Sequence, residues 1–187
     1  MELANGTATV LMSNYALAAV PPPLMKMLHL TTLNLSFNKL TNLPTEIGYL
    51  VHLVELDVSS NLLTSLPPEI GMSCGSEMKN FVTGGIVTLE KLDISNNQLV
   101  EIPESFNRLV SLRELELNSN CLTLLPSGFS RWKLLTKFCP NENALELITH
   151  DLCNMSLLVE LNLSKNKLTE LPPALGKLKN LVRLDCR

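Results

Sequence analysis

The sequence has few aromatic residues and no long apolar run. Only 4% of its 187 residues are aromatic although 45% are hydrophobic, so the core must be built mainly from aliphatic side chains, chiefly leucine. No run approaches the roughly 18 apolar residues that a membrane-spanning helix requires. The N-terminus also lacks a basic flank, because Glu2 is acidic, and this argues against a secretory signal peptide. We therefore expect a cytoplasmic chain without a membrane span.

The net charge and the cysteine spacing exclude further classes of protein. The formal charge is −3, without the clustered Lys and Arg of a nucleic-acid-binding surface. The five cysteines (Cys74, Cys121, Cys139, Cys153 and Cys186) are scattered and form no CxxC pair. A disulfide framework or a zinc site needs tighter spacing, so we expect reduced thiols and no metal site.

Motifs of catalysis and cofactor binding are missing as well. The sequence contains no GxxxxGK[ST], no GxGxxG after a strand, no HExxH and no GxSxG. The three histidines are far apart, and two of them, His29 and His52, share one position of the repeat described next. We therefore expect no catalytic residue, no cofactor and no enzyme activity from this chain alone.

A 23-residue repeat fills most of the chain. Its clearest copy is the segment 30–53, LTTLNLSFNKLTNLPTEIGYLVHL, in which Leu53 restarts the pattern begun at Leu30. Further copies begin at Leu53, Leu89, Leu112, Leu135, Leu158 and Leu181, and a worn copy with Tyr15 in place of a recurring asparagine precedes Leu30. The total is seven full repeats and one truncated repeat, without a polar capping unit.

Several stretches depart from this repeat. We expect an N-terminal tail at 1–6, a repeat domain at 7–187, and an insertion at 73–85 that is either a tolerated surface loop or a peptide-like binding loop. In the copy that begins at Leu135, Phe138 and Pro140 take the two inward strand positions, which predicts a distorted strand. The truncated last copy indicates either a fragment of a longer protein or an exposed strand edge that docks a partner or a second copy.

The repeat itself predicts the local structure. Its LxxLxL segment alternates as a short β-strand does, with leucines facing inward and the intervening side chains facing outward. An asparagine recurs after each strand, where its amide can bond backbone groups in its own turn and in the neighbouring coil: Asn38, Asn61, Asn97, Asn120, Asn143 and Asn166. A proline also recurs, at Pro21, Pro44, Pro67, Pro103, Pro126 and Pro172, and holds the convex side extended.

These residues resemble the leucine-rich repeat family. The LPxxIGxL form, at Leu43-Pro44, Ile47-Gly48 and Leu50, is similar to its intracellular Ras-associated, scribble-like scaffolds. The resemblance implies an α/β solenoid, a horseshoe arc with a concave parallel β-sheet and short helices or irregular turns outside. It also implies a non-catalytic protein-interaction module, a signalling scaffold for a protein partner such as a component of a small-GTPase pathway. The alternative is a recognition arm or fragment of a larger kinase, phosphatase or cyclase.

The outward residues of the strands and turns are the candidate partner-binding residues. They are Thr32, Asn34, Phe37, Glu55, Asp57, Lys91, Asp93, Glu114, Glu116, Asn118, Glu142, Glu160 and Asn162. The middle three repeats place five of the carboxylates beside one lysine, Lys91: Glu55, Asp57, Asp93, Glu114 and Glu116. Parallel strands lie about 4.8 Å apart, so we expect one acidic surface there. Such a surface orients a basic partner, although solvated strand positions are often acidic in any repeat. Phe37 is either an anchor for the partner or a residue of ordinary repeat packing.

Overall fold

The computed structural model describes residues 8–72 and 85–187. The predicted tail at 1–6 lies outside the described residues, as does the predicted insertion at 73–85 apart from Gly85. Within the described residues, no helix is both long and apolar enough to cross a membrane.

Each coil contributes one short strand and, where the structure describes it, one 3-10 helix on the opposite side. The strands are β1 (Ala8–Leu11), β2 (Leu30–Asn34), β3 (Glu55–Asp57), β4 (Lys91–Asp93), β5 (Glu114–Glu116), β6 (Lys137–Cys139), β7 (Glu160–Asn162) and β8 (Arg183–Asp185). The 3-10 helices are η2 (Pro22–Lys26), η3 (Thr45–Tyr49), η4 (Pro68–Ile70), η5 (Glu104–Arg108), η6 (Phe129–Arg131), η7 (His150–Asn154) and η8 (Pro173–Lys177).

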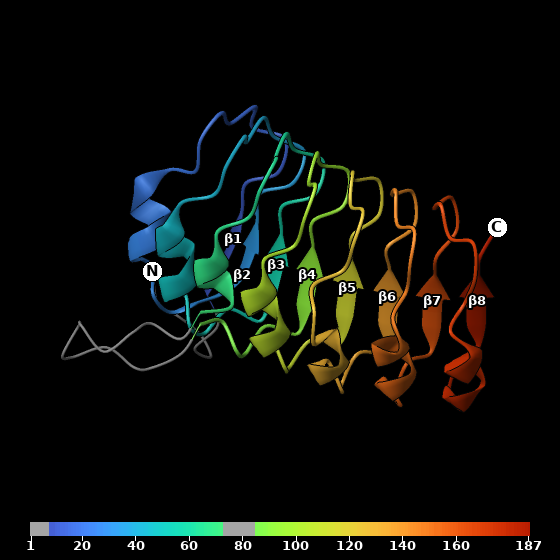
Figure 1. Cartoon of the computed structure of the whole chain (residues 1–187). Coiled ribbons are helices and arrows are strands. Elements are labelled where there is room, and N and C mark those ends of the chain that lie inside the picture. Colours follow the sequence, from blue (N-terminus) through green and yellow to red (C-terminus); the bar gives the residue numbers. More distant parts are fainter. Residues whose placement is uncertain (1–7, 73–84) are drawn as a thin grey trace.

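The strands form one open, parallel sheet in chain order from β1 to β8 (Figure 1). The sheet lines one side of the arc and the 3-10 helices line the other, with β1 and β8 at opposite ends. This confirms the predicted solenoid, a horseshoe arc with a concave parallel sheet. Parallel strands joined by short coils can stack in this way because each coil buries its leucines against the next.

The 23-residue spacing sets the register of the sheet. The central inward residues align across all neighbouring strands from β2 to β8: Leu33, Leu56, Leu92, Leu115, Phe138, Leu161 and Leu184. The first six of these side chains are at most 2% exposed, because each is covered by a coil on both sides. The core is therefore one continuous aliphatic stack that runs the length of the arc.

The recurring asparagines bond adjacent coils together. Asn61, for example, donates from Nδ2 to the carbonyls of Val58 and Ser59 in its own turn and of Leu35 in the preceding coil, and its Oδ1 accepts the Leu40 N–H. The same pattern recurs at Asn38, Asn97, Asn120, Asn143 and Asn166. One asparagine side chain thus satisfies the hydrogen-bonding capacity of four backbone groups, three carbonyls and one N–H.

Proline and glycine shape the convex side. Pro44 lies in an extended conformation (φ −68°, ψ 146°) and directly precedes η3, and Pro67 does the same before η4. A Cβ added at Gly71 would lie 2.2 Å from the Ser105 carbonyl oxygen of the next coil, so neighbouring convex turns approach closely only because glycine stands there.

The copy that contains Pro140 is less distorted than the sequence predicts. β6 keeps its three-residue length, and Phe138 is fully buried next to Trp132, with the ring centroids 6.2 Å apart. The disturbance is confined to the end of the strand, where β6 and β7 align in two residue pairs whereas β5 and β6 align in three. Pro140 has no N–H to donate at the position from which Leu117 and Leu163 each donate to the next coil.

Candidate protein-binding face

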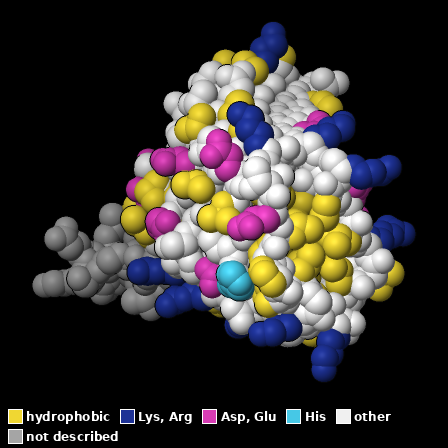
Figure 2. All heavy atoms as spheres, turned by 45° about the vertical axis from the view of Figure 1, so that its right-hand side comes forward, with side chains coloured by type: hydrophobic (Ala, Val, Ile, Leu, Met, Phe, Trp, Pro, Cys, Tyr) yellow, Lys and Arg dark blue, Asp and Glu magenta, His cyan; other side chains and the backbone are white. Residues whose placement is uncertain are grey.

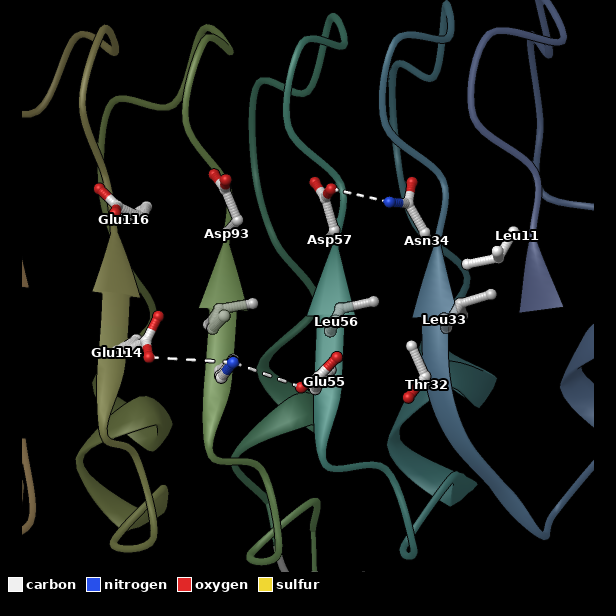
Figure 3. Close-up of a pocket in the computed structure, with 12 residues that line it drawn as sticks. Leu11, Thr32, Leu33, Asn34, Glu55, Leu56, Asp57, Asp93, Glu114 and Glu116 are labelled. Atoms are coloured by element: carbon white, nitrogen blue, oxygen red, sulfur yellow. Dashed lines mark hydrogen bonds and ion pairs between the residues drawn. The ribbon is translucent and has the colours of Figure 1, made fainter. Parts of the chain in front are cut away.

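The outward strand residues form two rows across the concave face (Figure 3). The first row runs through Thr32, Glu55, Lys91, Glu114, Lys137, Glu160 and Arg183, each aligned with its neighbours in the sheet. The second row runs through Asn34, Asp57, Asp93, Glu116 and Cys139, and Asn162 and Asp185 continue it in β7 and β8. Register therefore brings the candidate residues from β2 to β5 together, as the repeat predicts.

The first row alternates in charge and is largely self-paired. Lys91 Nζ lies 3.5 Å from Glu55 Oε1 and 3.9 Å from Glu114 Oε1, so one lysine bridges two strands (Figure 3). Farther along the sheet, Arg183 Nη1 lies 3.5 Å from Glu160 Oε2. Exposed pairs of this kind contribute little to stability, but they neutralise the row.

A second lysine, Lys137, neutralises one carboxylate of the expected acidic surface. Lys137 of β6 forms an ion pair with Glu116, and the hydrogen bond that Lys137 donates to Glu116 raises the pKa of Lys137, so this lysine stays charged. The middle three repeats hold the five carboxylates and one lysine, as expected, and the next repeat adds Lys137 at their border. Lys137 has the same outward position in its repeat as Glu114 and Lys91 in theirs.

Two carboxylates of the second row, Asp57 and Asp93, have no ion-pair partner among the described residues. Asp57 accepts hydrogen bonds from Asn34 Nδ2 (3.0 Å) and from the Ser59 amide and hydroxyl (3.0 and 2.6 Å), and Asp93 accepts them from the Ser95 amide and hydroxyl (2.9 and 2.6 Å). None of the salt bridges among the described residues involves either aspartate. Asp57 and Asp93 are adjacent in register, so two negative charges lie side by side.

The charged form of Asp93 is disfavoured where the residue lies. Burial raises the pKa of Asp93, and the neighbouring charges of Asp57 and Glu116 raise it further, although the hydrogen bonds from Ser95 oppose the shift. A raised carboxyl pKa means that the ionised form is disfavoured where it lies. A Lys or Arg side chain placed against this pair would relieve that cost.

A shallow groove runs over both rows from β1 to β5. Its volume is about 340 Å³, and residues of β1 to β5 line it, among them Leu11, Asn34, Asp57, Asp93 and Glu116. Figure 3 shows the carboxylates of the second row pointing out from the strand ends on one side of the sheet. The groove thus joins an apolar end at β1 to an acidic middle.

Three candidate residues lie in turns outside the two rows. Phe37 adopts φ 54° in the turn after β2 and is 63% exposed, so it is not packed in the core. Its role as an anchor for a partner stays a prediction. Glu142 lies in a corresponding turn, where the hydrogen bond from Lys165 Nζ (2.7 Å) lowers its pKa. Asn118 follows β5 and its carbonyl accepts the Asn96 N–H.

Glu160 and Asn162 lie on β7, away from the acidic middle. Glu160 pairs with Arg183, and Asn162 Oδ1 accepts hydrogen bonds from the Ser164 amide (3.1 Å) and hydroxyl (2.6 Å). The structure therefore separates both residues from the group on β2 to β5.

Cys139 lies in the second row beside Glu116 but has no features of a reactive thiol. Burial raises its pKa to about 12, so it stays protonated at neutral pH. The four described cysteines are all free, and no group of three or more metal-ligating side chains occurs among the described residues.

Comparison with known proteins agrees with this architecture. Residues 10–74 and 87–138 match the leucine rich repeat family, and residues 157–178 match a second leucine rich repeat description. No curated protein matched the chain in sequence. Domains of this family generally act as protein-interaction modules.

Two solved structures with the same fold are of bacterial proteins. The chain is 32% identical to a leucine-rich repeat protein of Leptospira interrogans, with a TM-score of 0.63, over 92% of this chain and 53% of that one. It is 24% identical to internalin C2 of Listeria monocytogenes, with a TM-score of 0.79, over 94% of this chain and 69% of that one; this likeness concerns the fold alone. The chain spans about half the length of the Leptospira protein. Because the family matches cover more than half of its residues, the chain belongs to the leucine-rich repeat family.

Proposed function

We propose that the chain is a non-catalytic protein-interaction module whose concave face holds a basic segment of a partner protein. The observation that carries this proposal is the pair Asp57 and Asp93, two adjacent carboxylates without a cation of their own among the described residues. The surrounding carboxylates Glu55, Glu114 and Glu116 are already paired with lysines. A basic segment of the partner is therefore attracted mainly to Asp57 and Asp93, which favours specific binding and fast association.

Exposed apolar side chains supply a second contact at the N-terminal end of the groove. Leu11, Tyr15 and Phe37 are each more than half exposed. Tyr15 and Phe37 lie on neighbouring coils that are bonded together there, because the Tyr15 N–H donates to Asn38 Oδ1, and Asn38 directly follows Phe37. Aromatic anchors beside charged groups are typical of the residues that dominate binding energy at interfaces. The partner segment would thus carry a bulky apolar side chain at one end and Lys or Arg at the other.

Within this proposal the chain is an intracellular signalling scaffold of the cytoplasm. Four free cysteines support a reducing compartment. The LPxxIGxL form, similar to that of Ras-associated scaffolds, supports a partner in a small-GTPase pathway. Fold alone does not fix function, so these assignments depend on the identity of the captured partner.

Affinity capture with matched charge variants tests the proposal. The variant Asp57→Asn with Asp93→Asn removes both unpaired charges and keeps the hydrogen-bond acceptor, as Asn34 and Asn162 do at the same position of other coils. The control is Glu46→Gln with Glu101→Gln, two exposed residues off the strands that change the net charge equally.

Quantitative mass spectrometry then compares the proteins retained by each chain. We expect a set of partners with basic segments that the wild type and the control retain and the concave variant loses. Retention of the same proteins in the same amounts by the concave variant would rule out the proposed binding face.

A further inference from the structure

One edge of the arc lies between the 3-10 helices and the strands that follow them. In every described coil except that of η4, the residue after the helix packs into the core; Leu50, Leu109 and Trp132, for example, are 0% exposed. The residues on either side of it therefore face outward. Equivalent positions of neighbouring coils lie side by side on this edge, since the Glu90 N–H donates to the Val54 carbonyl of the preceding coil (2.8 Å).

Exposed cations gather in two rows along this edge. One row holds the last residue of the 3-10 helices, and the other holds the residue two positions later. The cations of both rows, which we call the basic edge, are Lys26, Arg108, Arg131, Lys133, Lys177 and Lys179. None of the six takes part in a salt bridge among the described residues, whereas Lys91, Lys137 and Arg183 on the concave face all do. Figure 2 shows Lys and Arg side chains along the lower margin of the molecule, where η7 and η8 lie in Figure 1.

An apolar stripe runs beside these cations over six neighbouring coils. Its members are Leu28, Val51, Val87 and Val110 in the second row and, one position closer to the strands, Leu134 and Leu157. Five of them are 36–46% exposed, and Val51 is partly exposed. The Thr88 hydroxyl donates to the Val51 carbonyl (2.9 Å), so the coils adjoin at the stripe itself. Tyr49, which is 39% exposed, takes the position of the cations at the end of η3.

The carboxylates around the basic edge form no ion pair with its cations. Glu90, on the strand side, is paired with Arg113 (3.2 Å). Those of the 3-10 helices lie in the first turn, before the cations: Glu46, Glu69, Glu104 and Asp151. Salt screens exposed charges beyond about 8 Å at physiological ionic strength, so the local excess of positive charge, rather than the net charge of −3, decides what this edge attracts.

We propose that the basic edge binds the surface of a membrane that contains anionic lipids. The six cations lie against the negative headgroups, and the apolar stripe enters between them, as Lys and Arg beside Leu and Val do on peripheral membrane proteins. Tyr49 suits the same layer, because aromatic side chains with a polar tip favour the membrane–water interface. A nucleic acid would contact the cations through its phosphates and leave the stripe in water, so the stripe favours a membrane.

Cosedimentation of the 187-residue chain with lipid vesicles tests this proposal. The probes are vesicles of equal parts phosphatidylcholine and phosphatidylserine, and vesicles of phosphatidylcholine alone. The edge variant removes three cations of interior coils: Arg108→Gln, Arg131→Gln and Lys133→Gln. The control variant changes the net charge equally at three exposed residues away from this edge: Lys39→Gln, Lys165→Gln and Lys167→Gln. A third variant, Val110→Ser with Leu134→Ser, tests the apolar stripe.

We expect the wild type to bind the phosphatidylserine vesicles, more weakly as salt is added, and not the phosphatidylcholine vesicles. Each cation near an anionic membrane is worth about 5-fold in affinity, so the edge variant should bind about 100-fold more weakly. The control variant should bind as the wild type does. The stripe variant should bind about 10-fold more weakly, because it loses apolar area that leaves water on binding.

Three results would overturn the proposal: no binding of the wild type to the phosphatidylserine vesicles, equal losses in the edge and control variants, or unchanged binding of the stripe variant. Tighter binding to a DNA duplex than to the vesicles, lost in the edge variant alone, would assign the edge to nucleic acid instead. Native circular dichroism spectra of all variants separate these outcomes from misfolding. None of the substituted residues belongs to the two rows of the concave face, so the result is independent of the proposed function.

Discussion

Removal of one buried asparagine amide should destabilise the whole arc. Asn97 is 8% exposed and lies near the middle of the stack. Its Nδ2 donates to the carbonyls of Val58, Ile94 and Ser95 at 3.0–3.1 Å, and its Oδ1 accepts the Leu63 N–H at 3.0 Å. The substitution Asn97→Ala removes all four bonds at once.

The four backbone partners are affected unequally, and this sets the magnitude. The Val58 carbonyl keeps a hydrogen bond from Asn61, the Ile94 carbonyl keeps one from Asn120, and the Ser95 carbonyl keeps one from the Ser60 N–H. The Leu63 N–H, by contrast, would lose its acceptor, because the structure shows no other hydrogen bond from this group. An orphaned buried donor costs about 1–3 kcal/mol, and the weakened carbonyls add about 1 kcal/mol, so we expect a loss of about 3 kcal/mol.

Urea unfolding followed by far-UV circular dichroism measures this loss as a change in midpoint at constant slope. Asn166→Ala is the matched control, because Asn166 makes the same bonds in a less buried coil near the end of the stack, where water can replace them. We expect its cost to be about half as large. A cost below about 1 kcal/mol for Asn97→Ala, or equal costs for both, would refute the view that these amides hold the coils together.

Three further predictions concern the strand residues. Because the pKa of Asp93 is raised in the folded state, its charge opposes folding above that pKa; Asp93→Asn should raise the melting temperature at pH 7, and the gain should disappear as the pH falls below 3.8. A gain that is independent of pH would contradict this. Pro140→Val restores an N–H opposite the Asn162 carbonyl and should add about 1 kcal/mol in urea unfolding, whereas unchanged or lower stability would contradict the missing-bond explanation. In the native state at pH 8, iodoacetamide should modify exposed Cys121 and spare buried Cys139, as peptide mapping would show; equal modification would contradict that burial.

Most of the fold could be predicted from the 23-residue spacing of the repeat. Because inward and outward positions recur every 23 residues, the sequence predicts the parallel sheet, the alignment of Leu56 with Leu92 and the two outward rows before any coordinate is known. Leu56 and Leu92 align although the predicted insertion lies between them, and the described chain resumes with the Ile86 N–H bonded to the Ile70 carbonyl.

Charge pairing and exposure were harder to predict. The link between Lys137 and Glu116 is diagonal across two strands and two rows, so it depends on side-chain conformations that position in a repeat does not specify. Phe37 fits the repeat equally well as a packed or an exposed residue, and only the structure shows that it is exposed. Pro140 disturbs little because a strand of three residues loses just one bond there.

Carboxylate footprinting tests the central claim most directly. The chain is treated with a carbodiimide and glycine ethyl ester, alone and with the partner that the concave variant fails to capture, and the modified Asp and Glu residues are mapped by mass spectrometry. We expect the partner to protect Asp57 and Asp93 and to leave Glu46 and Glu101 equally modified. Protection of Glu46 and Glu101 with unchanged modification of Asp57 and Asp93 would show that the partner binds outside the concave face.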